Sequence, residues 1–580
     1  MNPVYEAFTE VMQPGSNLSI GEWFSKYVKV VDSPHGANYD INQTPWFKEI
    51  AEAVAENYND EIVIVAPVGS GKTAFYEALI QWITAEEPGF TMVAMQTDQD
   101  AKDLWETRLS KAMKLCSPIN NLWPKDRNAI RKGAVIFPHM SLLMGGANLS
   151  NLQSKSCRWV IGDEVWLWKP GMLDEARGRT HDRWNARLLF VSQGGEEGTD
   201  WHNTFKETNQ CHFNWFCEEC EKPNKWSHSN IKYEKVRDTD DQYDLEAIKK
   251  SVYMECPHCE AKYKDDATTR RRLSFNSKYI PENEKALSVK KGYTYTDYAV
   301  WWKPWSKLVL RWIKASDEMK RGYIDPMKKL KQKRLADFWK DDFGDVKIKL
   351  LAADYKKADF LAGELWEGEL YRVMTVDVQR DHYWLVMRTW KADGTSRLLY
   401  EGKIATDEVI RDIQIKYKVQ DKLVFLDAQF DTGRVYDYCV KYGWTALHGH
   451  GNDGFTHTKK RGKRNIRVRK FYSKYELAQA PSGGQAPYIF WSNEKIKDTL
   501  MILRAGQGMA WEVPEDVSED YKHQIDSEVK REVINKATGQ VSKRYVKIKK
   551  DNHLLDCEAM QVAAAMMLNV LKSPEIEVSS

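Results

Sequence analysis

EIVIVAPVGSGKT, residues 61–73, carries the strongest structural signal in the chain. The apolar run Ile62–Val65 predicts a short buried strand, and a helix is expected from Thr73 after a turn that contains glycines. This order of strand, loop and helix is typical of a phosphate-binding loop, in which backbone N–H groups at the start of the helix hold phosphates. Ala66 stands where the first glycine of the pattern is usual, so the match is Ala-x4-Gly-Lys-Thr.

The loop predicts binding of ATP together with Mg²⁺. Lys72 is expected to reach the β- and γ-phosphates, and the Thr73 hydroxyl is expected to ligate Mg²⁺. An ordinary glycine turn beside a lysine is the alternative, but it does not explain Gly71-Lys72-Thr73 directly after a strand. The residues expected to contact the nucleotide are Ala66, Gly69, Ser70, Gly71, Lys72 and Thr73.

Two more predicted strands end in polar residues. RWVIGDE, residues 158–164, places Asp163 and Glu164 after an apolar run, at the strand end where α/β sheets bind ligands. Asp163 is expected to hold Mg²⁺ through water, and Glu164 is expected to polarise the attacking water. The alternative is that this Asp-Glu pair is only a solvated turn. RLLFV, residues 187–191, leads into Ser192 and Gln193, which fit residues that sense the γ-phosphate in motor ATPases; a plain Ser-Gly loop is the alternative.

Four cysteines form two CxxC pairs within residues 211–262, a segment that we interpret as an insertion. Two such pairs can place four thiolates tetrahedrally around Zn²⁺, and a set of four cysteines leaves no open position for catalysis. We therefore expect a structural, zinc-ribbon-like site. Its ligands would be Cys217, Cys220, Cys256 and Cys259.

The second half of the chain carries three aspartates in related settings. Asp377 and Asp427 lie toward the ends of the apolar strands predicted at 371–379 and 423–429, and Asp556 lies in the first turns of a predicted helix. Two strand ends and a helix hold the carboxylates of RNase-H-like nucleases, which use two divalent cations on a phosphodiester. Each aspartate alone is often only a cap. Further candidates for this Mg²⁺ or Mn²⁺ site are Asp431, Asp551 and His553.

Composition limits the class of protein. A net charge of +3 over 580 residues excludes a uniformly basic surface, so any nucleic-acid surface has to be local. The local candidate is the basic run Lys459–Lys470, for which a solvated face and a contact with phosphate groups are both open. The N-terminus lacks the layout of a signal peptide, and no apolar run reaches the roughly 20 residues of a membrane span, so we expect a soluble, intracellular protein.

We expect an α/β protein in five segments. A helical lead-in (1–58) precedes a P-loop NTPase domain of the RecA/ASCE-like type (59–345), which contains the zinc-ribbon insertion. A linker (346–370) then leads into an RNase-H-like endonuclease domain (371–572), and residues 573–580 are expected to form a mobile tail. Inside the NTPase domain, residues 293–302 favour a strand and residues 305–334 favour a basic helical stretch.

The order of these motifs resembles that of the large terminase subunit of tailed bacteriophages, of the GpA type. The motifs that carry the resemblance are GKT at 71–73, IGDE at 161–164, the four cysteines, TVDVQ at 375–379 and HLLD at 553–556. The resemblance covers roughly residues 40–570.

The resemblance implies a motor that hydrolyses ATP to move double-stranded DNA into a procapsid, and a nuclease that cuts concatemeric DNA. It implies that Glu164 is the ATPase base, that Ser192 and Gln193 couple hydrolysis to movement, and that the three aspartates are nuclease ligands. It further implies a homo-oligomeric ring in the host cytoplasm, working with a small terminase subunit and the portal protein, and no membrane. His553 stands where this resemblance would place an acid.

Two other interpretations remain open at this point. One is a helicase–nuclease of DNA repair or restriction, which would normally carry a second recombinase-like lobe. The other is a nucleotide-switched DNA-binding scaffold whose acidic residues are structural.

Overall fold

The computed structural model separates into two compact units, which are described one at a time. The first comprises Met1–Ile313 with Lys328–Lys340, and the second Lys314–Met327 with Asp341–Ser580. The structure describes residues 16–31, 38–56, 59–131, 133–153, 155–237, 243–286, 289–320, 324–340, 359–461, 464–534, 541–572 and 576–577.

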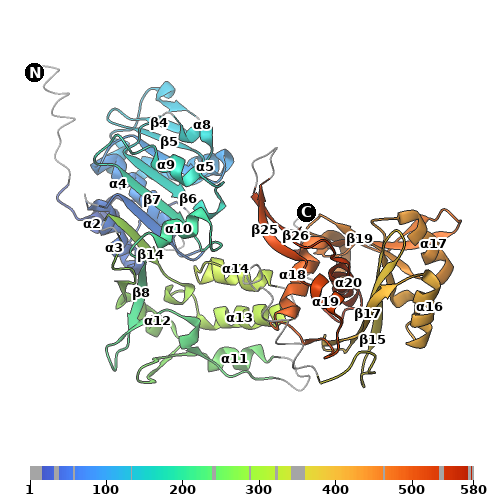
Figure 1. The fold of residues 1–580 in the computed structure, drawn as a ribbon. Coiled ribbons are helices and arrows are strands. Elements are labelled where there is room, and N and C mark those ends of the chain that lie inside the picture. Colours follow the sequence, from blue (N-terminus) through green and yellow to red (C-terminus); the bar gives the residue numbers. More distant parts are fainter. Residues whose placement is uncertain are drawn as a thin grey trace, which may run out of the picture. The chain divides into compact units, whose positions relative to one another are not determined.

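The first unit is built on an 11-stranded sheet with the order β13-β8-β14-β1-β7-β6-β2-β5-β4-β3, and with β9 paired to β8 (Figure 1). From β14 to β5 the neighbours run parallel, so their carboxyl ends share one edge of the sheet. The strands are β1 (Glu61–Val65), β2 (Thr91–Met95), β3 (Ile130–Arg131), β4 (Ala134–Ile136), β5 (Ser141–Gly146), β6 (Trp159–Asp163), β7 (Arg187–Ser192), β8 (Cys211–Phe216), β9 (Pro223–Lys225), β13 (Lys278–Pro281) and β14 (Lys290–Thr294). Every residue of β1, β6 and β7 is buried, as expected for parallel strands that are covered on both faces.

The structure describes the following helices in this part of the chain, with residues 314–320 of α13 and 325–327 of α14 assigned to the second unit. They are α2 (Ile20–Tyr27), α3 (Lys48–Ala55), α4 (Lys72–Glu86), α5 (Asp98–Leu104), α6 (Ser110–Leu115), α7 (Ser117–Asn120), α8 (Leu149–Leu152), α9 (Met172–Arg177), α10 (Asp200–Lys206), α11 (Leu245–Ser251), α12 (Ala267–Phe275), α13 (Trp305–Lys320) and α14 (Asp325–Arg334). The predicted strand before the phosphate-binding loop and the helix after it are confirmed as β1 and α4. Nearly all side chains of α4 from Phe75 to Ile83 are buried, which marks it as an internal helix.

Two predictions in this unit need correction. The strand expected at 293–302 ends at Thr294, because the Thr296 side chain accepts a hydrogen bond from the Tyr298 N–H and starts a 3-10 turn at Asp297–Ala299. The helical stretch expected at 305–334 consists of two helices, α13 and α14, and residues 321–323 between them lie outside the described part.

The expected insertion at 211–262 also begins later than predicted. Cys211–Phe216 forms β8, a strand of the main sheet that pairs with β14 and β13. The segment beyond it contains α11 and a small sheet of β10 (Ile231–Lys232), β11 (Tyr253–Glu255) and β12 (Lys262–Lys264). The acidic run Asp238–Asp241 lies outside the described residues.

The second unit has an eight-stranded sheet with the order β22-β23-β19-β18-β15-β16-β17-β24. Its strands are β15 (Tyr371–Val378), β16 (Tyr383–Trp390), β17 (Ser396–Ile404), β18 (Val424–Asp427), β19 (Thr445–His450), β22 (Glu476–Gln479), β23 (Gln485–Ser492) and β24 (Trp511–Glu512). The predicted strands at 371–379 and 423–429 are confirmed as β15 and β18. β15 runs parallel to β18 and antiparallel to β16, so this is a mixed sheet.

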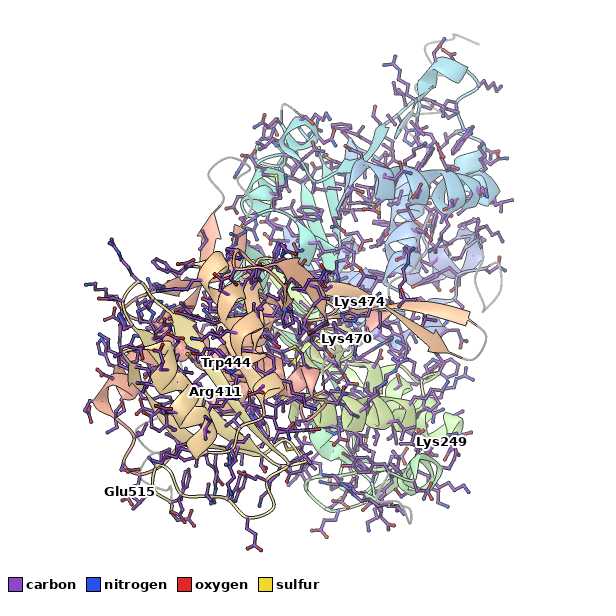
Figure 2. All side chains as sticks on the ribbon, turned by 90° about the vertical axis from the view of Figure 1, so that its right-hand side faces the viewer. Lys249, Arg411, Trp444, Lys470, Lys474 and Glu515 are labelled. Atoms are coloured by element: carbon purple, nitrogen blue, oxygen red, sulfur yellow. The ribbon has the colours of Figure 1, made fainter. Side chains whose placement is uncertain are left out.

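Each face of this sheet has its own core. Helices α16 (Asp407–Lys416) and α17 (Thr432–Tyr442) contribute to one core, together with the fully buried Trp444 (Figure 2). Helices α18 (Asn493–Arg504), α19 (Glu519–Gln524) and α20 (His553–Met567) contribute to the other. Along β15, Met374, Val376 and Val378 enter the first core, so the odd-numbered residues, including Asp377, face α20.

Two hairpins complete the second unit. The basic run 459–470 falls in the hairpin of β20 (Phe455–Arg461) and β21 (Arg464–Lys470), and Lys470 at its end is labelled in Figure 2. β27 (Ile576–Glu577) pairs with β21, while the rest of the expected tail, 573–575 and 578–580, lies outside the described residues. The second hairpin is β25 (Glu528–Ile534) with β26 (Val541–Lys547).

The outer segments of the predicted organisation are only partly described. Residues 1–15, 32–37 and 57–58 of the expected lead-in and residues 346–358 of the expected linker lie outside the described part. Residues 359–370 form neither helix nor strand. Among the described helices, none combines the length and apolarity required to cross a bilayer.

Candidate active sites

The phosphate-binding loop has the backbone shape that its sequence requires. Gly69 and Gly71 have φ angles of 71° and 95°, a region in which a side chain would be strained. The Ser70 hydroxyl donates to the Pro67 carbonyl at 2.7 Å, which closes the turn. The Lys72 ammonium donates to the carbonyls of Ala66 and Pro67 at 3.0 and 3.1 Å. Burial lowers the pKa of Lys72, while the charges of Glu164 and Asp163 act to raise it.

Residues far along the chain hold this loop in place. The Val68 N–H donates to the Lys333 carbonyl at 2.8 Å. The Val68 carbonyl accepts hydrogen bonds from Lys303 Nζ at 2.8 Å and from Arg334 Nη1 at 3.3 Å. The indole N–H of Trp46 donates to the Ser70 carbonyl at 3.3 Å. None of these supporting residues belongs to a recognisable motif, and sequence analysis missed them.

The acidic pair lies at the end of β6, on the edge of the sheet where β1 delivers the loop. Asp163 Oδ2 accepts from the Tyr76 hydroxyl at 2.8 Å, and Oδ1 accepts from the Glu164 N–H at 2.9 Å. Burial raises the pKa of Asp163 to about 6. Glu164 has a positive φ of 47°, and its Oε2 accepts from the Trp166 indole N–H at 3.0 Å. A left-handed backbone is uncommon for a residue with a side chain, and the hydrogen bond from Trp166 holds one carboxylate oxygen of Glu164.

Ser192 and Gln193 are buried at the end of β7, between β1 and β6. The Ser192 carbonyl accepts from the Ala66 N–H at 2.8 Å, and its hydroxyl accepts from the Trp166 N–H at 3.3 Å. The Gln193 carbonyl accepts from the Trp201 indole at 2.9 Å. Ser192 therefore connects the first residue of the phosphate-binding loop with the segment that follows Glu164.

The three aspartates of the second unit come together. In the parallel pair of β15 and β18, Val376 is opposite Leu426, so Asp377 and Asp427 follow at the same end. Asp556 lies in the first turn of α20, the helix that β15 faces. Burial raises the pKa of Asp427 to about 7, and the negative charges of Asp377 and Asp556 add to this shift. An all-carboxylate set suits hard divalent cations, which would relieve this repulsion.

Neighbouring side chains orient two of these carboxylates. Asp377 Oδ2 accepts from His553 Nδ1 at 2.6 Å and from Gln379 Nε2 at 2.9 Å. Asp556 pairs with Lys497 Nζ at 2.9 Å and accepts from Asn552 Nδ2 at 2.7 Å. Sequence analysis noted His553 but missed Lys497 and Asn552.

The other second-tier candidates have different settings. Asp431 accepts from the Arg434 N–H at 3.1 Å and caps α17. Asp551 is half exposed, and its Oδ1 lies 3.9 Å from His553 Nε2.

The four cysteines of the two CxxC pairs converge. Their sulfurs all lie within 4.8 Å of one another, with 3.5 Å between Cys217 and Cys259 and 3.7 Å between Cys220 and Cys256. Four thiolates on one Zn²⁺ at about 2.3 Å would be ~3.8 Å apart, so the spacing fits. Although burial acts to raise it, the pKa of Cys217 is lowered to about 6 by hydrogen bonds from the Tyr263 hydroxyl and from backbone N–H groups.

Family models match most of the chain. Residues 33–274 match the model of the "Phage terminase large subunit gpA, ATPase domain", and residues 290–575 match that of the "Terminase large subunit gpA, endonuclease domain". A comparison with curated proteins finds no match.

Solved structures of large terminases are also similar to the chain. That of bacteriophage HK97 is 12% identical over 94% of this chain and 99% of its own, with a TM-score of 0.33. That of the thermophilic bacteriophage D6E is 11% identical over 91% and 98%, with a TM-score of 0.29. The ATPase domain of the Thermus phage P74-26 large terminase is 11% identical over 50% and 92%, also with a TM-score of 0.29.

These TM-scores are too low to argue from, so the assignment rests on the two family models, which together span the phosphate-binding loop, the acidic pair and all three aspartates. The chain therefore belongs to the gpA family of phage terminase large subunits, DNA-packaging enzymes that combine an ATPase and an endonuclease in one polypeptide.

Proposed function

We propose that the ATPase centre is formed by the ends of β1 and β6. Lys72 and the N–H groups of the loop would hold the nucleotide phosphates, Thr73 would ligate Mg²⁺, and Asp163 would hold the same ion through water. Bound Mg²⁺–ATP supplies the phosphoryl group and neutralises its developing charge. The hydrogen bond from Tyr76 supports this assignment because it fixes one Asp163 oxygen.

Glu164 is proposed as the group that orients and deprotonates the attacking water. Its backbone geometry and the hydrogen bond from Trp166 limit the positions that its carboxylate can adopt. Ser192 contacts both the loop and the Trp166 segment, so a change at the phosphates would reach β7 through two hydrogen bonds. This contact supports a coupling role for Ser192 and Gln193.

The nuclease centre is proposed to consist of Asp377, Asp427 and Asp556, holding two divalent cations, Mg²⁺ or Mn²⁺. Bound cations activate water and stabilise the leaving oxygen of a phosphodiester. The protein's own contribution is to orient the carboxylates, through His553 on Asp377 and through Lys497 and Asn552 on Asp556. The observation that carries this proposal is the placement of Asp377 and Asp427 at the same end of the parallel strands β15 and β18, with Asp556 on the helix that packs against β15.

The cysteine cluster is proposed to bind one structural Zn²⁺. Four thiolates complete its coordination, so the ion would stabilise the segment between β8 and α12 and take no part in hydrolysis. The spacing of the sulfurs supports this role.

The partners are proposed from the family. They are double-stranded DNA, the portal protein of the procapsid, a small terminase subunit and further copies of the chain in a ring, all in the host cytoplasm. On the basic hairpin, Arg467 and Arg469 are exposed on either side of the buried Val468, which places two cations on one face for DNA phosphates.

Plasmid cleavage and DNA-stimulated ATPase activity of the purified chain test both centres, with Mg²⁺ or Mn²⁺. Asp377→Ala is expected to abolish cleavage and leave the ATPase, whereas Lys72→Ala is expected to abolish the ATPase. The matched controls are Asp381→Ala and Lys111→Ala, which remove exposed charges and should change neither activity. If wild type cuts and Asp377→Ala cuts equally well, the proposed nuclease centre is wrong.

A further inference from the structure

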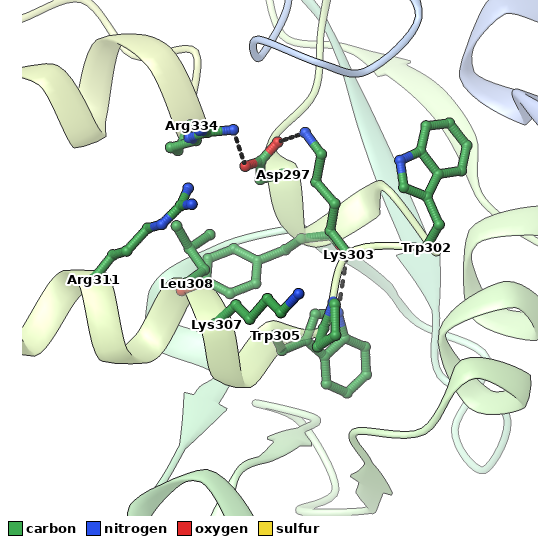
Figure 3. A pocket seen from close by; sticks show the side chains of 10 residues that line it. Asp297, Trp302, Lys303, Trp305, Lys307, Leu308, Arg311 and Arg334 are labelled. Carbon is green, nitrogen blue, oxygen red and sulfur yellow. Dashed lines mark hydrogen bonds and ion pairs between the residues drawn. The ribbon is translucent and has the colours of Figure 1, made fainter. Parts of the chain in front are cut away.

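A second cationic site lies beside the phosphate-binding loop, in the same unit. It is a pocket of about 210 Å³ between the segment 297–311 and the end of α14 (Figure 3). A water molecule in liquid occupies about 30 Å³, so the pocket has room for an ion of several heavy atoms. Its lining combines aromatic rings with the side chains of Lys303, Lys307, Arg311, Arg334 and one acid, Asp297.

Two of the cations are already engaged. Asp297, which is 6% exposed, is bonded to Lys303 Nζ at 2.6 Å and lies 3.5 Å from Arg334 Nη1 (Figure 3). The same two cations donate to the Val68 carbonyl. Burial raises the pKa of Asp297, and burial lowers that of Lys303, with the charges of Arg334 and Arg311 adding to the latter shift. One carboxylate therefore faces an excess of positive charge.

The side chains of the other two cations form no ion pair or hydrogen bond within the described part of the chain. Lys307 and Arg311 lie one turn apart on α13, and both side chains are exposed. Both side chains line the pocket. Cations gathered in this way repel one another unless an anion joins them, and a guanidinium offers paired donors that match phosphate oxygens.

We propose that this pocket is a second anion site that binds a phosphate group. Lys307 and Arg311 would hold the phosphate group, and Arg334 would add a further positive charge to the pocket. The site is separate from the phosphate-binding loop, where backbone N–H groups and Lys72 face the ligand. The two are connected, because Arg334 and Lys303 bond to the Val68 carbonyl of that loop. The phosphate group could come from free phosphate, the product of ATP hydrolysis, or from the DNA backbone.

Binding measurements on the full chain distinguish these sources. With the loop filled by a non-hydrolysable ATP analogue and Mg²⁺, equilibrium dialysis would measure binding of radiolabelled inorganic phosphate. In a second arm, fluorescence anisotropy would follow a labelled duplex at several salt concentrations. The test variant is Lys307→Gln/Arg311→Gln. The matched control is Lys111→Gln/Lys114→Gln, which removes two exposed cations one turn apart on α6, outside the pocket.

Free phosphate is the ligand if wild type and control bind phosphate while the test variant binds roughly tenfold or more weakly, as expected for lost charge-assisted hydrogen bonds. DNA is the source if phosphate binding is absent but the test variant alone lowers the salt slope of duplex binding, by about 0.9 per lost contact. The proposal is overturned if the test variant matches wild type in both arms, or if the control loses as much as the test variant. It is also overturned if acetate competes as well as phosphate, because the pocket would then accept carboxylates.

Discussion

Among single residues, Lys497 carries a buried positive charge between two acids. Its ammonium group is buried and lies 2.9 Å from Asp556 and 2.7 Å from Glu528. Although burial acts to lower it, the pKa of Lys497 is raised by these two negative charges. One buried cation thus neutralises a proposed metal ligand and a second acid at the same time.

Lys497→Ala is expected to destabilise the second unit by about 3 kcal/mol, because it leaves the buried Glu528 and the partly exposed Asp556 without their cation. Cleavage should be lost with it, since Asp556 would no longer be oriented. Denaturant unfolding and plasmid cleavage measure the two effects. Lys495→Ala on the same helix is the control, because its ion pair with Asp325 is long, at 3.8 Å, and partly exposed, and should contribute at most about 1 kcal/mol. Equal stability of the two variants would contradict the prediction.

Glu77 provides a pH-dependent test in the first unit. Burial raises its pKa to about 7, against the opposing charge of Arg108, whose Nη2 lies 2.9 Å from Oε2. Within the described structure, Oε1 has no hydrogen-bond partner. In the unfolded chain, the Glu77 carboxyl group loses its proton near its ordinary pKa of 4.5. In the folded chain, it keeps this proton up to about pH 7. The stability that this proton provides is therefore complete below 4.5 and is lost as the pH rises through about 7.

Glu77→Gln keeps the shape of the side chain and removes its titration. Relative to wild type, the variant should gain stability between pH 5 and 7, by at most about 1.4 kcal/mol per pH unit. Thermal unfolding across this range measures the difference. Glu106→Gln, on the exposed surface, controls for the loss of one acid. Parallel curves for wild type and Glu77→Gln would show that Glu77 is ionised throughout.

At the scale of elements, the segment between β8 and α12 is built from very short strands. Its described strands have two or three residues each, and such short strands give few hydrogen bonds and little buried surface. The proposed zinc ion would add to the stability of this segment, since a metal bound only by the folded segment adds its binding energy to folding.

Cys220→Ala is expected to reduce bound zinc from one ion per chain to nearly none and to lower the melting temperature of the first unit. Elemental analysis and calorimetry of the same samples measure both. Cys211→Ala should keep its zinc, because Cys211 is buried in β8, outside the cluster. Zinc-free wild type, or a Cys220→Ala variant that retains the ion, would refute the assignment.

Sequence patterns identify elements whose signal is local. GKT after an apolar strand locates β1, the loop and α4, and the strands that carry Asp163, Asp377 and Asp427 follow from their apolar runs. The missed residues act through long-range contacts: Tyr76 reaches Asp163 across 87 positions, and Lys303 reaches Val68 across 235. The periodic pattern of apolar residues in the sequence does not predict such a contact. The strand predicted at 293–302 was wrong for a related reason, because aromatic residues that favour strands there pack around the loop, as Tyr295 does on Trp46.

At the scale of the whole molecule, the separate cores predict separate responses to ligands. A core of buried side chains covers one face of the sheet that carries the phosphate-binding loop, and separate cores cover the two faces of the sheet that carries the aspartates. A ligand stabilises the unit to which it binds, by about 2.7 kcal/mol at a hundredfold excess over Kd. Calorimetry of the full chain should therefore show Mg²⁺–ADP raising one transition and Mn²⁺ without nucleotide raising another. Lys72→Ala should lose only the first shift, and Asp377→Ala only the second. If Asp377→Ala also removes the response to nucleotide, the two centres are thermodynamically coupled, and the assignment of one ligand to each unit is wrong.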